Sequence, residues 1–237
     1  EQAIESIARA GLENYNLDLM YALPGQSVES AVEDIRLALA AGSTHLSHYQ
    51  LTLEPNTAFH ASPPVLPNED AAWEMQQACA SHVSDAGMEN YEISAWCRPG
   101  RACRHNLNYW EYGDFLGIGA GAHGKLTLPA EGAVRRLIRQ RHPRTWMEGA
   151  VRGDSIVENR AVDSGERVFE FFLNQLRLRG GVRKSMFTPR TGLSWKSVED
   201  RVEELVARGL LEERDERLVP TETGWRFVNE IQAVFLP

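Results

Sequence analysis

The segment YNLDLMYALPGQ, residues 15–26, alternates apolar and polar side chains from Tyr15 to Leu19, continues with Met20 and Tyr21, and then turns at Pro24-Gly25. Such alternation is typical of a β-strand, here over residues 15–21, and a Pro-Gly pair marks the turn that ends it. Ser27 is a good helix N-cap, and residues 28–39 carry one apolar face at helical spacing before Gly42. Since residues 45–53 are predicted to be a second strand, this stretch predicts a strand–helix–strand unit with parallel strands.

The same alternation continues outward from this unit. Residues 3–12 are predicted as the end of a helix, residues 68–87 as another helix, and residues 91–95 and 115–119 as further strands. The expected fold class is α/β, an incomplete parallel (β/α) barrel, because four parallel strands are too few to close a barrel. The chain begins in mid-helix without a cap, so we expect an earlier part of the barrel to precede it.

The pattern changes after residue 144. Two apolar helical stripes, residues 168–176 and 198–206, precede two short strands at 210–213 and 217–220 and a last helix over 221–234. Helices followed by a two-stranded wing predict a small winged-helix-like domain. The expected domains are therefore residues 1–155, the barrel part with its glycine-rich floor, and residues 156–237, the C-terminal winged-helix-like domain.

Composition places the chain among ordinary globular proteins. Of its 237 residues, 43% are hydrophobic and 24% are charged. No run is long and apolar enough to span a bilayer and no signal peptide is visible, which predicts a cytoplasmic protein without membrane insertion. Three cysteines (Cys79, Cys97 and Cys103) are too few for a disulfide scaffold and fit a reducing compartment.

The net charge of −8 is unevenly distributed. Residues 98–144 hold nine Lys or Arg against three acids, a local charge of +6, so the remainder carries −14. This basic segment would attract an anionic ligand, although a solvated basic face is the simpler alternative. The helix expected over 197–208, which would enter a DNA groove in a winged-helix protein, has a net charge of −2. We therefore expect no nucleic-acid partner.

Two neighbouring stretches suggest a ligand pocket. HNLNYW, residues 105–110, combines an imidazole, two amides and two large aromatics, and DFLGIGAGAHG, residues 114–124, has glycine at nearly every second position. Glycine at this spacing suits a strand end where the backbone approaches something closely. Together the two stretches predict a pocket for a flat, large ligand. A loop with a capping Asn and packed aromatics is the alternative for either stretch alone.

Four motifs now carry a resemblance to a known family. They are NLDLMYALPGQ (16–26), YQLTLEPNT (49–57), HNLNYW (105–110) and GIGAGAHGK (117–125). In this order they resemble the HemW-type, heme-chaperone branch of the radical SAM proteins that are similar to oxygen-independent coproporphyrinogen III oxidase. The resemblance covers essentially the whole chain, and the HNxxYW signature favours the chaperone branch over the decarboxylating oxidases.

The resemblance implies S-adenosyl-L-methionine (SAM) and a 4Fe-4S cluster in the intact family member. The cluster needs three cysteines in a CxxxCxxC-like motif, which this chain lacks, since Cys97 and Cys103 are six positions apart and Cys79 lies on a predicted helix face. Cluster binding and SAM cleavage are therefore not expected of this chain alone, and whether it is an enzyme stays open.

By resemblance, Asp18 is the strand-end carboxylate that hydrogen-bonds SAM, and Thr52 and His123 line the SAM pocket. A carboxylate accepts hydrogen bonds only, which suits a ribose diol or an ammonium group. The alternatives are a strand-end Asp that caps a turn and a packed histidine behind Gly121.

For heme, a neutral imidazole is the expected axial ligand, and His105 is the candidate. Cys103 is a second possible ligand if neighbouring arginines stabilise its thiolate. A histidine with a purely structural role in a loop is the alternative for His105.

The remaining heme-site candidates surround these two. Tyr109 and Trp110 would form an apolar, stacking wall, Asn106 would orient the loop, and Arg104 or Arg101 would meet the heme propionates.

These features predict a heme-trafficking chaperone that binds heme and passes it to a heme-accepting protein. The alternatives are a coproporphyrinogen III oxidase, which decarboxylates propionates with a SAM-derived radical, and a winged-helix binding module. An unpaired strand edge at residues 15–21 would also allow a homodimer.

Overall fold

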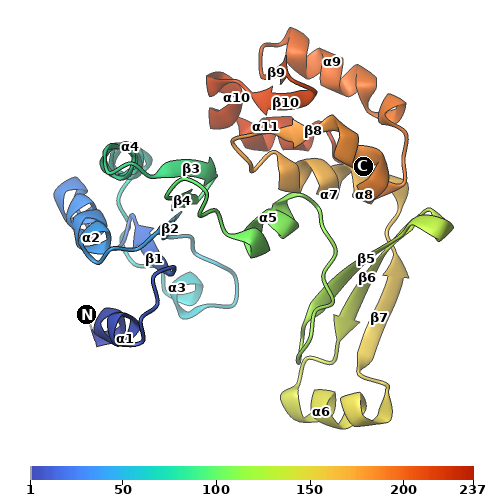
Figure 1. The fold of residues 1–237 in the computed structure, drawn as a ribbon, viewed down its shortest axis with the longest axis horizontal. Coiled ribbons are helices and arrows are strands. Elements are labelled where there is room, and N and C mark those ends of the chain that lie inside the picture. Colours follow the sequence, from blue (N-terminus) through green and yellow to red (C-terminus); the bar gives the residue numbers. More distant parts are fainter. Residues whose placement is uncertain (1) are drawn as a thin grey trace. The chain divides into compact units, whose positions relative to one another are not determined.

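The computed structural model describes residues 2–237 and divides into two compact units, the residues up to Cys103 and Arg104–Pro237 (Figure 1). The predicted domains, residues 1–155 and 156–237, stay a prediction. Strand β7 (Ile156–Ala161) hydrogen-bonds to β6 (Ala133–Arg139), so residues on the two sides of that predicted boundary share one sheet.

The first unit contains a four-stranded sheet with the order β1-β2-β4-β3. Its elements are α1 (Gln2–Arg9), β1 (Asn16–Tyr21), α2 (Val28–Ala40), β2 (His45–Gln50), α3 (Ala58–Ala61), α4 (Glu69–Asp85), β3 (Glu89–Glu92) and β4 (Ala95–Cys97). Strands β1 and β2 are parallel, which confirms the predicted strand–helix–strand unit.

The prediction of a parallel strand over residues 91–95 is wrong. This segment contains a hairpin in which β4 is antiparallel to both β3 and β2. Only Ile93 and Ser94 separate the two strands, and so short a connection can join antiparallel strands but not parallel ones. The Asn90 amide supports the turn by donating to the carbonyl oxygens of Glu92, at 2.6 Å, and Ala95, at 3.1 Å.

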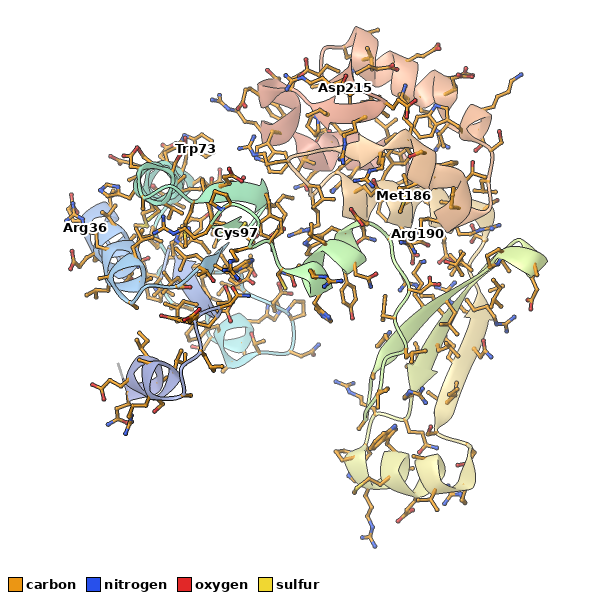
Figure 2. All side chains as sticks on the ribbon, viewed as in Figure 1. Arg36, Trp73, Cys97, Met186, Arg190 and Asp215 are labelled. Atoms are coloured by element: carbon orange, nitrogen blue, oxygen red, sulfur yellow. The ribbon has the colours of Figure 1, made fainter. Side chains whose placement is uncertain are left out.

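Helices α2 and α4 pack against each other and cover one face of this sheet (Figure 1). Ser27 caps α2 as predicted, in a capping box with Ser30. Ile35 and Leu46 are fully buried in the resulting core, and Figure 2 shows Arg36 and Trp73 on the outer sides of the two helices. The apolar spacing of α2 and α4 therefore predicted their buried faces correctly.

The second unit contains two antiparallel three-stranded sheets, with the orders β5-β6-β7 and β8-β10-β9. Its other helices and strands are α5 (Arg104–Trp110), β5 (His123–Leu128), α6 (Pro143–Arg152), α7 (Ser164–Gln175), β8 (Val182–Arg183), α8 (Phe187–Thr191), α9 (Glu199–Ala207), β9 (Leu211–Arg214), β10 (Arg217–Pro220), α10 (Glu222–Arg226) and α11 (Val228–Ala233). Three short 3-10 turns, Pro129–Glu131, Lys184–Met186 and Trp195–Ser197, lie between them.

The predicted strand over residues 115–119 is wrong. Only Phe115 forms a bridge, antiparallel to Lys125, and the following glycines leave the extended conformation. Gly117 has a φ of +61° and Gly119 a φ of +120°, values outside the β region that a strand requires. The glycine spacing therefore produces an irregular loop.

The C-terminal elements follow the predicted order of helices and strands. The predicted strands at 210–213 and 217–220 correspond to β9 and β10, whereas the last predicted helix breaks at Phe227 into α10 and α11. Phe171, Phe172, Phe187 and Phe235 form an aromatic core. Among the described residues, no helix has the length and hydropathy needed to cross a bilayer.

A buried lysine on β5 connects this strand to the turn that follows α5. Lys125 on β5 is 1% exposed, and its ammonium donates to the carboxylate of Asp114 and the carbonyl of Tyr112, each at 3.0 Å, and to Thr127 Oγ1 at 3.1 Å. Burial lowers the pKa of Lys125. Partial burial favours a higher pKa for Asp114, but hydrogen bonds from Thr127 and Lys125 outweigh it and lower the pKa. These contacts hold residues 112–114 against β5.

Tyr112 extends this arrangement to α7. Its hydroxyl donates to Glu170 Oε2 at 2.6 Å, and Arg136 on β6 pairs with the same carboxylate at 2.8 Å. Burial raises the pKa of Tyr112, so the phenol stays protonated and acts as the donor. We call the group Lys125, Asp114, Tyr112 and Glu170 the lysine clamp.

Replacing Lys125 with Met should destabilise the chain by about 2–4 kcal/mol, because a carboxylate and a buried carbonyl lose their cation. The expected cost lies toward the lower end because the Asp114 side chain is 36% exposed and water can partly solvate it. Urea unfolding at pH 7 measures the difference.

The control is Arg144→Met, which breaks the exposed Arg144–Glu148 pair and should cost less than about 0.5 kcal/mol. Equal costs for the two variants would show that the lysine clamp does not stabilise the fold.

Candidate functional site

A cavity of about 560 Å³ lies in the first unit, at the carboxyl ends of β1 and β2. The carboxyl ends of parallel strands are a frequent location of ligand sites in α/β proteins. Its lining comes from these two strand ends, the residues after β2, helix α4 and the β3–β4 turn: Met20, Tyr21, His48, Tyr49, Gln50, Leu51, Thr52, Gln76, Ile93 and Ser94.

Two neutral aromatic side chains line this cavity. The His48 ring lies 4.6 Å from the Tyr21 ring, centroid to centroid, and burial lowers the pKa of His48 to about 4. Burial also raises the pKa of Tyr21 to about 12. Both groups are therefore uncharged at neutral pH and can hydrogen-bond or stack against a ligand. Sequence reasoning missed His48, because it lies well inside the strand predicted over residues 45–53 and only the shorter observed strand, β2, brings it near a strand end.

The structure brings one predicted SAM-binding residue, Thr52, to the cavity, and its hydroxyl donates to Glu54 at 3.0 Å. Asp18 is the third of the six residues of β1 and so lies within the strand, not at its end as expected, and its exposed side chain does not line the cavity. His123 is the exposed first residue of β5 and belongs to the second unit. The predicted SAM-binding roles of all three residues stay predictions.

The HNLNYW stretch forms helix α5, which corrects the expectation of a loop. It contains neither Gly nor Pro to interrupt a helix. His105 and Tyr109 are four residues apart on one face, with ring centroids 4.8 Å apart, and Tyr109 lies 4.5 Å from Phe115. Asn106 is half-buried within this helix, so the segment it would orient is a helix and not a loop, and its role in a heme site stays a prediction.

The His105 ring is accessible. His105 is an exposed residue, and within residues 2–237 no protein group hydrogen-bonds to its ring nitrogens. Trp110, in contrast, packs into the second unit, where the Arg177 guanidinium lies 4.2 Å from the indole centroid. The buried Trp110 Nε1 has no hydrogen-bond partner among the described residues. Arg104 is exposed at the first position of the helix.

Sequence reasoning missed the role of Asn108, which holds the turn after α5. The Asn108 side-chain amide donates to the backbone carbonyl of Asp114 at 3.0 Å, and the backbone carbonyl of Asn108 accepts from Gly113 N at 2.7 Å. A Cβ at Gly113 would overlap the Asn108 side chain, so this position requires glycine. The second Asn of the motif therefore has a structural role.

The backbone of the glycine-rich stretch lies against the backbone of β5 and does not face open space. A Cβ at Gly117 would overlap the carbonyl oxygen of His123, and a Cβ at Gly124 would lie 2.7 Å from the carbonyl oxygen of Leu116. These two glycines let residues 115–117 cross the start of β5 at close range. The close approach that the glycine spacing predicted is present, and its partner is the backbone of β5.

The cysteines do not form a metal centre. Burial raises the pKa of Cys79 to about 11, and burial also raises the pKa of Cys97, so both thiols stay protonated at neutral pH. Cys103 is a half-buried free thiol. Over the described part of the chain, no group of three or more His, Cys, Asp or Glu is arranged to hold a metal ion. The residues present therefore do not fit an iron–sulfur cluster.

Comparison with known proteins identifies relatives over the full chain. The model of the HemN C-terminal domain family matches residues 162–227. "Heme chaperone HemW" of Escherichia coli is 41% identical over 236 residues, which cover 100% of this chain and 61% of that protein. "Heme chaperone HemW" of Mycobacterium tuberculosis (strain H37Rv) is 35% identical over 229 residues, covering 94% of this chain and 55% of that protein.

The chain is a homologue of the HemW proteins. This confirms the resemblance that the four motifs predicted. The chain spans about three fifths of the length of the HemW proteins it matches.

A solved structure described as coproporphyrinogen III oxidase (HemN) from Escherichia coli, a radical SAM enzyme, superposes on this HemW homologue with a TM-score of 0.72. The match covers 99% of this chain and 57% of that one at 16% identity, so it shows a shared fold and no more. The chain is accordingly of mixed α/β class, as predicted.

Replacing Gly117 with Ala in this HemW homologue should destabilise it more than replacing Gly119 with Ala. Both residues have positive φ, which costs an Ala about 1–3 kcal/mol, but only Gly117 also faces a backbone carbonyl that a methyl group would overlap. That overlap should add about 1–3 kcal/mol. Urea unfolding of both variants measures the difference, and equal costs would show that the loop does not need to cross β5 closely.

Proposed function

We propose that this chain is the heme-binding part of a heme chaperone that passes heme to an accepting protein. The observation that carries the proposal is the exposed His105 ring, which has no protein hydrogen bond to its nitrogens among the described residues. A neutral imidazole with a free nitrogen lone pair is a common axial ligand of heme iron. The names of the relatives, heme chaperone HemW, support the same ligand.

The surroundings of His105 fit a flat, apolar ligand. Tyr109 and Phe115 continue from His105 as a row of rings, and the following loop exposes Leu116 by 62% and Ile118 by 79%. Exposed apolar side chains of this size often mark a binding surface. When bound, heme would supply the iron, and the chain would supply the imidazole and apolar contacts.

The proposal also gives roles to the other heme-site residues. Arg104 is an exposed cation on the same helix and suits a propionate. Trp110 packs under Arg177, so it would support the wall from behind rather than stack on heme. Asn106 would help to fix the helix, and Cys103 stays a candidate second ligand.

We also propose that the β1–β2 pair holds part of a SAM site. Thr52 lines the cavity there, and Asp18 presents an exposed carboxylate on β1 that suits a ribose diol or an ammonium group. His123 is the third proposed SAM-binding residue. The chain's own cysteines do not fit a cluster, so no radical step is assigned to these residues.

The same proposal assigns an architecture to each of the two predicted domains. The parallel β1–β2 pair with its outer helices would be part of a (β/α) barrel within residues 1–155. The α7-to-α11 segment with its antiparallel sheet β8-β10-β9 would be a winged-helix-like domain within residues 156–237. Helix α9 carries Glu199 and Asp200 in its first turn, which supports a structural or protein-docking role over nucleic-acid binding.

The fold shared with HemN favours one alternative, an oxygen-independent coproporphyrinogen III oxidase. Such an enzyme would bind a propionate-bearing porphyrinogen and remove carboxyl groups with a SAM-derived radical. Iron ligation separates the two functions, because a porphyrinogen contains no iron for His105 to bind.

Titration of the chain with hemin should give a shifted Soret band, and His105→Ala should weaken the affinity by about tenfold or more because the axial ligand is lost. His142→Ala is the matched control, since His142 is an exposed histidine of the same unit and should leave the affinity unchanged.

Cys103→Ala tests the second candidate ligand in the same titration. A thiolate ligand gives a different Soret position from an imidazole, so the spectrum of each variant identifies the ligand that remains. A wild-type spectrum and affinity for His105→Ala would contradict the proposed role of His105.

A homodimer is a further proposal. In the described part of the chain, β1 pairs with β2 only and lies at the edge of its sheet. Such an edge can pair with a second copy. Light scattering over a range of concentrations should show a mass that rises toward twice that of the chain, and a constant monomer mass would exclude this pairing.

A further inference from the structure

The parallel register of β1 and β2 places four polar side chains on one face of the sheet. Asn16 is paired with His45, and Asp18 with Ser47. Since alternate residues of a strand point to the same side, these four residues face away from the core that α2 and α4 form on the other side. A polar cluster therefore occupies the sheet face that carries Asp18.

The orientation of the Asn16 amide is determined by its neighbours. Asp18 Oδ1 lies 2.8 Å from Asn16 Nδ2, and a carboxylate can only accept, so the amide nitrogen must face Asp18. The amide oxygen then accepts from Ser47 Oγ, at 3.1 Å, and from His45 Nδ1, at 2.7 Å. Because an oxygen faces Nδ1, the proton of the His45 ring is on Nδ1.

The other nitrogen of His45 completes a chain of donors. A neutral ring protonated on Nδ1 leaves Nε2 as an acceptor, and the Tyr91 hydroxyl, 2.8 Å away, donates to it. His45 is 4% exposed, and its burial lowers its pKa against the opposing influence of Asp18, which favours the neutral ring. The hydrogen bonds thus run in one direction, from Tyr91 through His45 and Asn16 to Asp18.

The far end of this chain is open. Asp18 is an exposed residue, and within residues 2–237 its Oδ2 atom receives no protein hydrogen bond. One carboxylate oxygen is therefore fixed by the protein while the other is available to a ligand. A fixed carboxylate accepts from a ligand with a smaller loss of conformational freedom than a mobile one.

We propose that Asn16, His45 and Tyr91 are positioning residues that hold the Asp18 carboxylate toward a ligand with a vicinal diol or an ammonium group. The proposal rests on the proposed function of Asp18 in the SAM site. None of the three residues contacts the ligand itself; they act through Asp18. A buried histidine that only satisfies its own hydrogen bonds is the alternative, and it makes different predictions for ligand binding.

The first test is the tautomer of His45 in the full chain, observed by long-range proton–nitrogen NMR correlations of the histidine rings. The His45→Leu variant assigns the signals by their loss. The expected result is a neutral ring with its proton on Nδ1. A proton on Nε2 would reverse the direction of the chain and overturn the proposal.

The second test is the binding of SAM to the full chain and its variants, followed by NMR chemical shifts because they report weak affinities. Asp18→Asn and Asn16→Leu should each weaken binding by about fivefold, the equivalent of one net hydrogen bond. Ser47→Ala is the matched control, because it removes the other donor to Asn16 Oδ1 and leaves the His45 bond in place. Its affinity should stay within about twofold of the wild type.

A conservative pair of variants separates positioning from folding. In His45→Asn the amide nitrogen occupies about the place of Nδ1 and keeps the donor to Asn16, whereas His45→Leu removes it. The Asn variant should bind SAM more tightly than the Leu variant, and the two should unfold at similar urea concentrations. Equal affinities for Asn and Leu variants would overturn the proposal.

The outcomes also separate this inference from the proposed SAM site. If Asp18→Asn weakens binding while Asn16→Leu does not, Asp18 binds the ligand without the positioning chain, and only this inference fails. If Asp18→Asn has no effect, the carboxylate does not contact the ligand, and both proposals fail.

Discussion

The second unit depends on a single buried cation. Lys125 lies where a charge is costly, and it is tolerated because its three hydrogen-bonding positions are occupied by a carboxylate, a carbonyl and a hydroxyl. Through Tyr112 and Glu170 the same group reaches α7, the first helix after the start of the matched HemN C-terminal domain. The clamp thus fixes the turn between α5 and β5, and with it the end of the helix that carries His105.

This clamp also accounts for an unusual backbone conformation. Tyr112 has a φ of +54°, which a large L-residue rarely adopts without compensation. Its carbonyl accepts from Lys125, its ring lies 3.9 Å from the Lys125 ammonium, and its hydroxyl is bound by Glu170. Several contacts therefore hold one strained residue. This residue lies in the turn between Tyr109 on α5 and Phe115, the last two members of the row of rings that begins at His105.

In the first unit the corresponding constraint is the parallel register of β1 and β2. It divides the strands into an apolar face, which α2 and α4 cover, and a polar face with Asn16, Asp18 and His45. A shift by one residue would exchange the faces and bury the carboxylate in the core. Register and burial therefore fix where Asp18 lies, while the chain of hydrogen bonds fixes how it is oriented. The cavity at the carboxyl ends of the same strands is lined by the neutral side chains of Tyr21 and His48.

The sequence by itself determined the elements whose signals are local. The alternation of residues 15–21, the Ser27 cap, the apolar stripes of α2, α4, α7 and α9, and the two C-terminal strands all follow from periodicity and capping. The four motifs identified the relatives because a motif is also a local signal, a set of residue types at fixed spacing.

The tertiary structure decided features that leave no periodic signal in the sequence, including contacts between residues distant in sequence. It made residues 89–97 an antiparallel hairpin, turned residues 115–119 into an irregular loop, and left His105 exposed on a helix. It also paired Lys125 with Asp114, and Tyr91 with His45 across 46 positions. Hydrogen bonds between such residues leave no periodic trace in the sequence, because each requires only one suitable side chain at a place that the fold alone defines.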